Sequence, residues 1–379
     1  MSIISEKLHN DTLGFPPAKA ALGDSPNNIQ NDPPTCDTII DLTVLKGDNL
    51  KQAVLDLARS VLPEWRNVQN VDLIRVSGAM TNAVFFVTSD KKQRVLLRVY
   101  GIGCDQIVDR EKELVWLSRL SSQSLCPNLL AIFGNGRFEE YLASTTLTSK
   151  DIRDPETSVQ IATCLRQFHS SVNVYPPTGE LEIWRCVNKW YSTVFNLVPA
   201  LKQKTDQNTL EELDLRRLQH EIQHCKSILA HTPSPIVVAH NDTQYGNVLR
   251  LDRTGELVVV DFEYAGYNPR GFDIANHFCE WMYDYHSDQP ATFRAEKFPT
   301  DEEQLRFIEA YLKALDDPHD EAKTKNVQKE VSVWVMGSHL FWGLWGLIQA
   351  SQSEIDFDYF SYSAQRLKAF RSELAKWSA

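Results

Sequence analysis

The sequence lacks features that mark several classes of protein. Residues 1–10 contain no apolar segment of the kind found in signal peptides. No Cys-X-X-Cys pair occurs, and the seven cysteines are scattered singly at Cys36, Cys104, Cys126, Cys164, Cys186, Cys225 and Cys279. An odd and dispersed set in a long chain indicates free thiols in a reducing compartment. We therefore expect a cytoplasmic protein.

An excess of positive charge is also lacking. The chain has 39 Lys and Arg residues against 50 Asp and Glu residues, for a formal net charge of −11. Phosphate backbones repel such a chain, so we expect no nucleic-acid partner. An acidic surface suits a cationic small substrate better, although most net charge only aids solubility.

Long hydrophobic runs are nearly absent. Only residues 331–348 approach the length of a membrane span, and they include Ser332, Ser338 and His339. Polar groups are costly in lipid, so this run predicts a buried helix and no transmembrane segment.

With 379 residues, the chain is long enough for two lobes with separate cores.

The chain divides into three regions. Residues 1–41 are rich in Pro, Asn, Asp, Ser and Gly, which indicates a disordered tail. Residues 42–142 are predicted to form a small β-rich N-lobe that binds the nucleotide. Its predicted helices cover 48–61 and 108–120, and its predicted strands cover 71–76, 83–87, 94–100 and the piece through 132–141. Residues 143–379 predict a large, mostly helical C-lobe, with helices at 158–172, 210–229, 302–315, 329–350 and 359–377. The predicted fold class is α+β.

The most informative segment runs from His240 to Asn247 and is followed, after an apolar strand, by Asp261-Phe262-Glu263. Phosphoryl transfer from ATP requires a carboxylate to orient and deprotonate a hydroxyl, and oxygen ligands to hold magnesium. Protein kinases place an Asp and an Asn at the same interval as Asp242 and Asn247, and then Asp-Phe-Gly. One such residue alone is typical of a turn. All three at this spacing predict a kinase catalytic centre.

Each polar residue of this segment has an expected role. Asp242 is the predicted general base. Asn247 and Asp261 are the predicted magnesium ligands, since magnesium prefers oxygen donors. Glu263 either joins them or caps a turn. Gln244 is expected to hydrogen-bond phosphate or substrate.

Residues of the N-lobe are candidates for binding ATP. The turn from Ser77 through Thr81 to Asn82 would cover the phosphates with backbone N–H groups, unless it is a plain hairpin turn. Arg98 lies in a strand where protein kinases place a phosphate-pairing lysine. A buried cation requires a partner, either a phosphate or Glu113, with Glu111 as a competitor. The predicted ATP-binding residues are Ser77, Thr81, Asn82, Arg98, Glu113 and Gln244.

Two further residues are expected to support the catalytic loop. Asp273 either caps the helix that follows the metal motif or ties down the loop backbone from a buried position. His240 is expected to be a hydrogen-bonded core residue, since a lone histidine there is more often structural than catalytic.

Aromatic residues and one carboxylate are candidates for binding an ammonium group. Trp342 and Trp345 share one face of a predicted helix, and Tyr264, Glu280, Tyr285 and Tyr362 are the other candidates. Aromatic faces with a carboxylate can hold a quaternary ammonium, although aromatic stripes alone indicate core packing. Glu280 and Tyr285 cannot share one face of a continuous helix, so the helix must end between them if both line one site.

The motifs above, with residues 96–101, 232–235, 267–278 and 339–350, occur together in one family. From about residue 50 to its C-terminus the chain resembles the choline/ethanolamine kinase family, and residues 279–285 resemble the choline-preferring branch. The tail before residue 42 matches nothing recognised.

The resemblance implies a two-lobed protein-kinase-like (aminoglycoside-phosphotransferase-like) fold. It also implies MgATP-dependent phosphorylation of choline to phosphocholine, the first step of the CDP-choline route to phosphatidylcholine. ATP and Mg²⁺ are the implied cofactors, and the implied choline site contains Tyr264, Glu280, Tyr285, Trp342, Trp345 and Tyr362. Many members of that family are dimers, which leaves a homodimer open.

Three alternatives differ in chemistry. Ethanolamine would be the preferred substrate if hydrogen-bond acceptors replaced aromatic walls around the ammonium. An aminoglycoside-type phosphotransferase would have an acidic site, with Trp342 and Trp345 buried elsewhere. A pseudokinase would bind a partner without catalysis, but the joint presence of Asp242, Asn247 and Asp261 argues against it.

Overall fold

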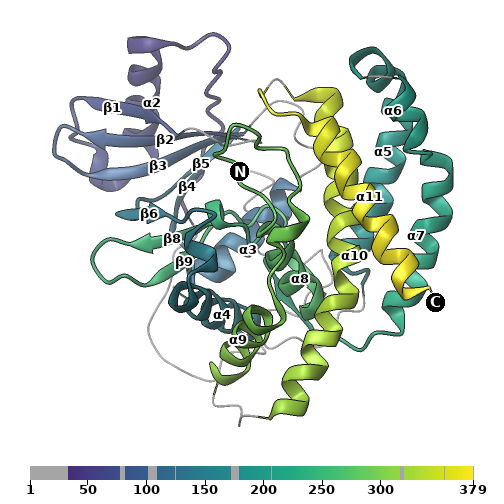
Figure 1. Ribbon diagram of the computed structural model, residues 1–379. Helices are drawn as coiled ribbons and strands as arrows, with labels where there is room; N and C mark the ends of the chain where they lie inside the picture. Colours follow the sequence, from purple (N-terminus) through teal and green to yellow (C-terminus); the bar gives the residue numbers. More distant parts are fainter. Residues whose placement is uncertain are drawn as a thin grey trace. The chain divides into compact units, whose positions relative to one another are not determined.

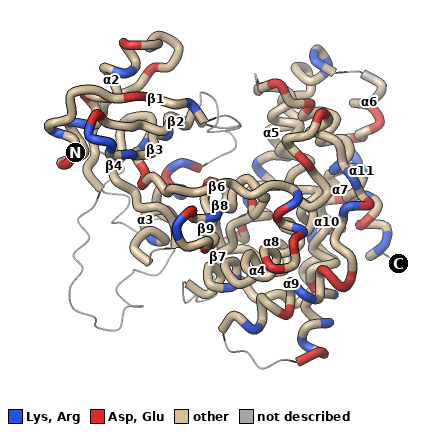
Figure 2. The backbone as a smooth tube through the Cα atoms, turned by 60° about the vertical axis from the view of Figure 1, so that its left-hand side comes forward, with Lys and Arg blue, Asp and Glu red and all other residues tan. Residues whose placement is uncertain are grey.

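The computed structural model describes residues 33–76, 82–100, 109–123, 125–171, 179–205, 207–315, 320–353 and 355–378. The chain divides into two compact units, Met1–Ala143 and Ser144–Ala379. The sequence predicts this division one residue earlier, between residues 142 and 143. Acidic and basic residues are interspersed in both units (Figure 2). The predicted phosphate-covering residues Ser77 and Thr81 lie outside the described residues.

The first unit contains a five-stranded antiparallel sheet with the order β1-β2-β3-β5-β4 (Figure 1). Its strands are β1 (Val71–Arg75), β2 (Asn82–Ser89), β3 (Arg94–Tyr100), β4 (Leu129–Phe133) and β5 (Gly136–Glu140). Its helices are α2 (Gly47–Val61), the 3-10 helix η2 (Pro63–Trp65) and α3 (Arg110–Ser121). Leu97 and Phe138 are register partners on neighbouring strands, and both are buried in one core with Val54 and Leu57 of α2. The predicted strands and helices of this region are present with small shifts at their ends, except that the predicted β-rich piece through 132–141 forms two strands, β4 and β5.

Residues 33–41, which the sequence predicts to belong to a disordered tail, pack against this unit, and residues 1–32 of the predicted tail lie outside the described residues. The backbone N–H of Cys36 donates a hydrogen bond to the carbonyl of Ile132 at 3.1 Å. The N–H of Ile40 donates to Asn135 Oδ1 at 2.9 Å, and the Ile40 side chain is buried in the core. Residues 33–41 therefore pack on β4 and the turn after it, because Ile40 supplies an apolar anchor within a polar segment.

The second unit is mostly helical. Its helices are α4 (Pro155–Ser170), α5 (Glu182–Lys204), α6 (Gln207–Glu212), α7 (Leu215–Ala230), α8 (Arg270–Glu280), α9 (Asp301–Lys313), α10 (Glu321–Gln352) and α11 (Tyr359–Trp377), with 3-10 helices η4 (Asp151–Arg153), η5 (Tyr245–Asn247) and η6 (Ala295–Lys297). The predicted helix over 210–229 is divided at Asp214, which has a positive φ of 41° and caps α7.

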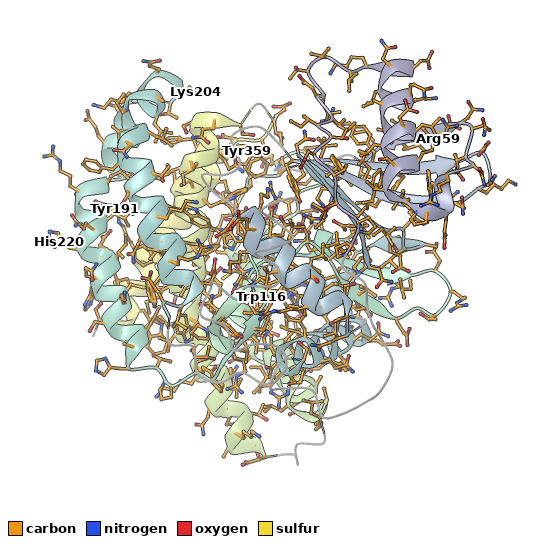
Figure 3. All side chains as sticks on the ribbon, turned by 180° about the vertical axis from the view of Figure 1, so that it is seen from behind. Arg59, Trp116, Tyr191, Lys204, His220 and Tyr359 are labelled. Atoms are coloured by element: carbon orange, nitrogen blue, oxygen red, sulfur yellow. The ribbon has the colours of Figure 1, made fainter. Side chains whose placement is uncertain are left out.

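The long helix α5 is absent from the sequence-based assignment. A signal for it is present, because Ile183, Val187, Trp190 and Val194 follow a helical period and are all buried. Tyr191 fixes α5 to the start of α7 by donating a hydrogen bond to the carbonyl of Leu215 at 3.1 Å (Figure 3).

The predicted buried helix over 329–350 forms the larger part of α10, which packs against α5, α8 and α11. Among the described residues, α10 alone is long and apolar enough to cross a membrane by length and composition. Of its most apolar window, 94% is buried inside the protein. Packing against neighbouring helices therefore accounts for its apolar composition.

Two small antiparallel sheets carry the catalytic segment. In one, β7 (Ile236–Ala239) pairs with β10 (Gly266–Pro269). In the other, β8 (Val248–Leu251) lies between β6 (Ser144–Thr146) and β9 (Leu257–Val259). Residues 240–247, the predicted catalytic loop, connect β7 to β8. Asp261-Phe262-Glu263, the predicted metal motif, follows β9. The apolar strands thus bring the ends of both polar segments together.

Candidate active site

The catalytic loop begins in a backbone conformation that is uncommon for residues with a side chain. Asn241 has a φ of +67°, in the left-handed region that Asn tolerates better than most residues. Its amide side chain donates to the carbonyl of Tyr264 at 2.8 Å and accepts from Asn268 Nδ2 at 2.8 Å. These contacts offset the backbone strain and hold the turn that precedes Asp242.

Asp273 of α8 ties down this loop from a fully buried position. Its carboxylate accepts hydrogen bonds from the backbone N–H groups of His240 and Asn241, both at 2.8 Å. His169 Nε2 lies 2.9 Å from the same carboxylate. Burial alone would raise the pKa of Asp273, but the bonds and charge of His169 lower it on balance. Since Pro269 is the N-cap of α8, the prediction of a tie to the loop is confirmed and that of a cap is wrong.

The two ends of the loop meet through a side-chain pair. Asn247 Nδ2 donates to Asp242 Oδ2 at 2.8 Å and to the Asp242 carbonyl at 2.9 Å. This arrangement fixes the Asp242 carboxylate and turns the amide oxygen of Asn247 away from it. Burial raises the pKa of Asp242 well above its ordinary value, and the nearby carboxylates of Glu280, Asp261 and Glu263 raise it further. A group of acids held together in this way favours binding of a cation.

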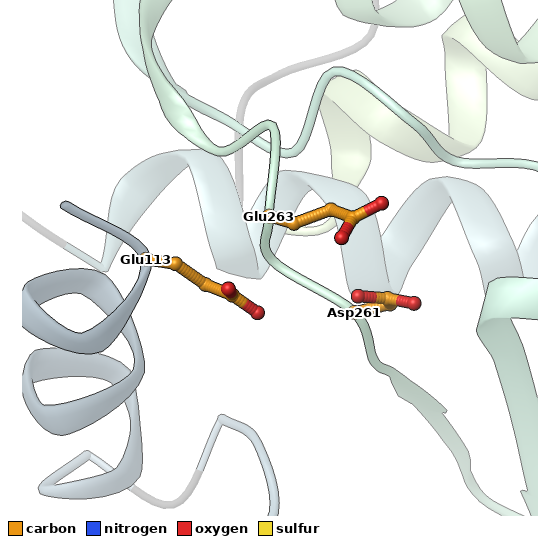
Figure 4. Close-up of side chains that lie close together, drawn as sticks. All are labelled: Glu113, Asp261 and Glu263. Atoms are coloured by element: carbon orange, nitrogen blue, oxygen red, sulfur yellow. The ribbon is translucent and has the colours of Figure 1, made fainter. Parts of the chain in front are cut away.

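Asp261 and Glu263 are the strongest candidates to hold that cation. Their carboxylate oxygens lie within 4.8 Å of each other, and Figure 4 shows both groups extending from the segment after β9. Asp261 has a φ of +70°, which bends the chain at the strand end. Hard oxygen donors from Asn247, Asp261 and Glu263 match the preference of magnesium. The residues present therefore fit a magnesium ion, and the role of Glu263 as one of its ligands stays a prediction.

Gln244 has a structural contact within the loop. Its Oε1 accepts the backbone N–H of Gly246 at 2.7 Å and caps η5. Its Nε2 lies 3.4 Å from Asn247 Oδ1. Binding of phosphate by Gln244 stays a prediction. It is supported by the position of the Gln244 amide group, which faces Asn247, a predicted magnesium ligand.

The histidines of the site are buried and structural. His240 Nε2 lies 3.0 Å from the carbonyl of Val260, so His240 links the loop to the end of β9, as the sequence analysis expects of a core residue. His277 Nδ1 lies 2.8 Å from the carbonyl of Thr243, and His277 Nε2 accepts from the indole of Trp281 at 3.2 Å. These contacts define a neutral His277 with its proton on Nδ1.

His277 is expected to make the fold sensitive to mild acid. Burial lowers its pKa from 6.5 to about 4. Above pH 6.5 both folded and unfolded chains hold it neutral; between pH 6.5 and 4 only the unfolded chain binds the proton. Over that window this group should lower the free energy of unfolding by about 3 kcal/mol.

Urea titrations of wild type and His277→Gln from pH 7.5 to 4 would measure this effect. The variant should show the shallower loss of stability as the pH falls. His220→Gln is the matched control, because His220 is exposed on α7 (Figure 3). Identical pH profiles for His277→Gln and His220→Gln would contradict the assignment.

The two predicted tryptophans lie beside the tyrosine of the metal motif. The indole of Trp345 donates to Tyr264 Oη at 2.8 Å. The rings of Trp342 and Tyr264 are edge to face with centroids 5.2 Å apart, and Trp342 and Trp345 are separated by the same distance. Asn276 Oδ1 accepts the indole N–H of Trp342 at 2.7 Å, while its Nδ2 donates to the carbonyl of Asn241 at 3.2 Å. The aromatic cluster and the catalytic loop are therefore directly connected.

Glu280 lies at the end of α8, in a hydrogen-bonded network with Tyr285 and Arg366. Arg366 is not among the residues predicted from the sequence. Tyr285 donates a hydrogen bond to Glu280 Oε2 at 2.6 Å. The helix ends between these residues, as required if both belong to one site. The other carboxylate oxygen is ion-paired with the buried Arg366. Arg366 also donates to Tyr362 Oη at 3.1 Å and lies 3.3 Å from His339 Nδ1.

Arg366 is a missed residue of this site. Its guanidinium carbon lies 4.5 Å from the ring centroid of Tyr283 and 5.2 Å from that of Tyr362. Burial and the positive charge of Arg366 lower the pKa of His339, which is therefore neutral. The sequence offers one signal: Arg366 follows Tyr362 by one helical turn, so both lie on one face of α11.

In the first unit, Arg98 has a partner that the sequence-based prediction does not include. It forms an ion pair with Glu139 at 3.2 Å. Glu113 pairs with Arg137 at 2.6 Å and with Arg110 at 2.9 Å. Although burial opposes its ionisation, Arg137, Arg110 and Arg98 lower the pKa of Glu113 to about 2.

Arg137 and Glu139 are missed residues of this cluster. Arg137 is the register partner of Arg98 across β3 and β5, and Glu139 contacts both arginines. The signal was their spacing of two residues in a strand, which places both on one face. Asn82 begins β2 and is buried.

Comparison with known proteins agrees with this geometry. A family model described as choline/ethanolamine kinase matches residues 73–371. The chain is 35% identical to "Probable choline kinase 2" of Arabidopsis thaliana over 85% of this chain and 91% of that protein. It is also 35% identical to "Choline/ethanolamine kinase" of Homo sapiens over 81% of each. A solved Plasmodium vivax ethanolamine kinase superposes with a TM-score of 0.74 at 25% identity, covering 86% of this chain and 91% of that one.

The β-rich and helical units, with a catalytic loop of this kind, define a phosphotransferase of the two-lobed protein-kinase-like fold. The matched model spans most of the chain, and the relatives are similar over nearly their full length. The chain belongs to the choline/ethanolamine kinase family.

Proposed function

We propose that this protein transfers the γ-phosphate of ATP to the hydroxyl of choline and forms phosphocholine, the first step of the CDP-choline route to phosphatidylcholine. The observation that carries the proposal is the joint position of Asp242, Asn247 and Tyr264, which are linked through Asn241 and Asn276 to the tryptophans of α10. A loop for phosphoryl transfer next to an aromatic cluster suits an amino alcohol with a positively charged head.

The residues of the second unit divide the chemical work. Asp242 orients the substrate hydroxyl and accepts its proton, and Asn247 holds the Asp242 carboxylate in place. Asn247, Asp261 and Glu263 would hold magnesium. When bound, magnesium supplies positive charge that offsets the negative charge of the phosphates. The left-handed backbone at Asn241 and the tie to Asp273 keep the base in position without reorganisation.

In the first unit, we propose that the cluster around Arg98 serves the phosphates of ATP. Three buried or partly buried arginines, Arg98, Arg110 and Arg137, face two carboxylates, Glu113 and Glu139. Guanidinium groups donate paired hydrogen bonds that match the geometry of phosphate, so such a cluster suits the phosphates of ATP.

The six cysteines in the described residues are free thiols, and this supports our proposal of a cytosolic location.

Choline is the favoured substrate over ethanolamine because aromatic rings cluster at the predicted amine site. Trimethylammonium is attracted to aromatic rings, whereas a primary ammonium requires hydrogen-bond acceptors. The one carboxylate of the aromatic network, Glu280, already has an ion-pair partner in Arg366 and a donor in Tyr285. It is thus less available to a primary ammonium. The position of Trp342 and Trp345 beside Tyr264 also disfavours the aminoglycoside alternative.

The test is ATP-dependent transfer to choline and to ethanolamine, measured side by side with magnesium varied. We expect a higher kcat/KM for choline and activity that depends on magnesium. A clear excess of kcat/KM for ethanolamine would reverse the substrate assignment. Absence of transfer to both amines would refute the proposed function.

Replacing Trp342 with Leu is expected to weaken choline binding by about 1–2 kcal/mol, since one aromatic face is lost from a desolvated site. The KM for ethanolamine should change less, because a primary ammonium depends less on aromatic faces. Initial rates over a range of both amines would measure this. Trp377→Leu is the control, because Trp377 is only partly buried at the end of α11. Equal losses for both amines would contradict a cation–π role.

A further inference from the structure

Tyr245 is a buried residue of the catalytic loop to which the preceding chemistry gives no role. It lies in η5 between the base Asp242 and the metal-ligand candidate Asn247, and its side chain is 1% exposed. Its hydroxyl accepts a hydrogen bond from the backbone N–H of Tyr285 at 2.6 Å. The rings of Tyr245 and Tyr285 pack with centroids 5.8 Å apart. Both the backbone and the side chain of Tyr285 thus contact the catalytic loop.

Tyr285 belongs to the amine side of the site. Its hydroxyl donates to Glu280 at 2.6 Å, and its ring stacks on Tyr283 with an interplanar angle of 5°. Tyr283 in turn contacts Arg366 and Tyr362. Tyr285 lies beyond the end of α8 and outside regular secondary structure. Its position therefore depends on side-chain contacts, among them those with Tyr245 and Glu280.

We infer that Tyr245 is a positioning residue that sets the distance between the group that activates the hydroxyl and the group that binds the ammonium. Asp242 and Tyr245 are three residues apart in one rigid loop, so the bond from Tyr245 to Tyr285 transmits the position of the base to the aromatic network. The site should accordingly select amino alcohols whose hydroxyl and ammonium are separated by two carbons. This inference rests on the proposed function and deepens it.

The first test is Tyr245→Phe, which retains the ring and removes the acceptor. We expect the KM for choline to rise about three- to tenfold, as for loss of one hydrogen bond, with the KM for MgATP unchanged. Discrimination between choline and its three-carbon homologue, homocholine, should weaken. Tyr191→Phe is the matched control, since it removes a tyrosine hydroxyl that bonds a backbone carbonyl on α7. An unchanged KM and unchanged discrimination would overturn the inference.

A double-mutant cycle distinguishes positioning through Tyr285 from simple packing. If Tyr245 acts through Tyr285 and Glu280, then Tyr245→Phe should add little to the effect of Tyr285→Phe on the KM for choline. Fully additive effects of the two substitutions on the KM for choline would overturn the inference. Equal increases in the KM for choline and in the KM for MgATP would overturn it as well. Phosphoryl transfer to choline by the wild-type protein distinguishes failure of the proposed function from failure of this inference. If the wild type does not transfer phosphate to choline, the proposed function fails. If it does, and Tyr245→Phe has the wild-type KM for choline, only the inference about Tyr245 is refuted.

Hydrogen exchange in the wild-type protein gives a measurement that does not depend on folding of a variant. The Tyr285 amide should be protected, because its hydrogen is bonded to the buried Tyr245 hydroxyl. An amide at Tyr285 that exchanges as fast as those of an unstructured peptide would overturn the inference.

Discussion

Replacing Asp242 with Asn should lower kcat for transfer to choline by at least about 10²-fold, the usual contribution of a general base. The amide has the same shape as the carboxylate and can still meet Asn247, so the loop should keep its conformation. It cannot accept the hydroxyl proton. Steady-state kinetics under saturating choline and MgATP would measure kcat, and circular dichroism would verify the fold.

Asp288→Asn is the matched control for this experiment. Asp288 is an exposed residue beyond the amine-binding segment, so the same change of charge there should leave kcat close to that of wild type. If Asp242→Asn also retained kcat within about twofold, a factor worth less than 1 kcal/mol of barrier, another group would have to be the base.

The second large effect is expected for Arg366→Met, which should lower the free energy of unfolding by about 3–5 kcal/mol. Arg366 is fully buried, and its removal leaves the Glu280 carboxylate buried without its ion-pair partner. Met fills much of the same volume, so the loss would come from the uncompensated charge rather than from a void. Urea unfolding at pH 7.5 would measure the change.

Adding Glu280→Gln to Arg366→Met provides the discriminating comparison. The double variant should regain a large part of the lost stability, because a neutral amide needs no counter-ion and can still accept from Tyr285. Lys325→Met, which breaks the exposed pair with Glu321, should have little effect. A double variant no more stable than Arg366→Met would show that packing, and not the charge pair, is what Arg366 supplies.

The catalytic segment could be predicted from sequence because its geometry is local. Strands β8 and β9 form a hairpin, so Asn247 and Asp261 necessarily meet at one end of it. The role of Asp273 as a tie to the loop could be stated only as one of two options, since a cap and a tie give the same sequence pattern. The backbone contacts to His240 and Asn241 distinguish them.

The ion pairs could not be predicted in the same way. Glu280 and Arg366 are 86 residues apart, and α8 and α11 approach through packing against α10 rather than through any short motif. Arg98 offers the same lesson. The sequence pattern suggested Glu113 or Glu111 as its partner and gave no sign of Glu139, which the strand register places on the adjacent strand. The choice among several carboxylates is made by tertiary structure, which a single sequence does not contain.

Helices α10 and α11 meet at two glycines in the aromatic part of the second unit. A Cβ atom at Gly346 would lie 3.1 Å from Tyr362 Cδ1, and one at Gly343 would lie 2.8 Å from Leu367 Cδ2. The backbone of α10 at these glycines therefore packs directly against side chains of α11, and the ring centroids of Trp345 and Tyr362 lie 6.3 Å apart. A wider separation of these rings would require the two helices to give up this close packing. Quaternary ammonium compounds with bulkier alkyl groups than methyl should therefore bind less well than choline.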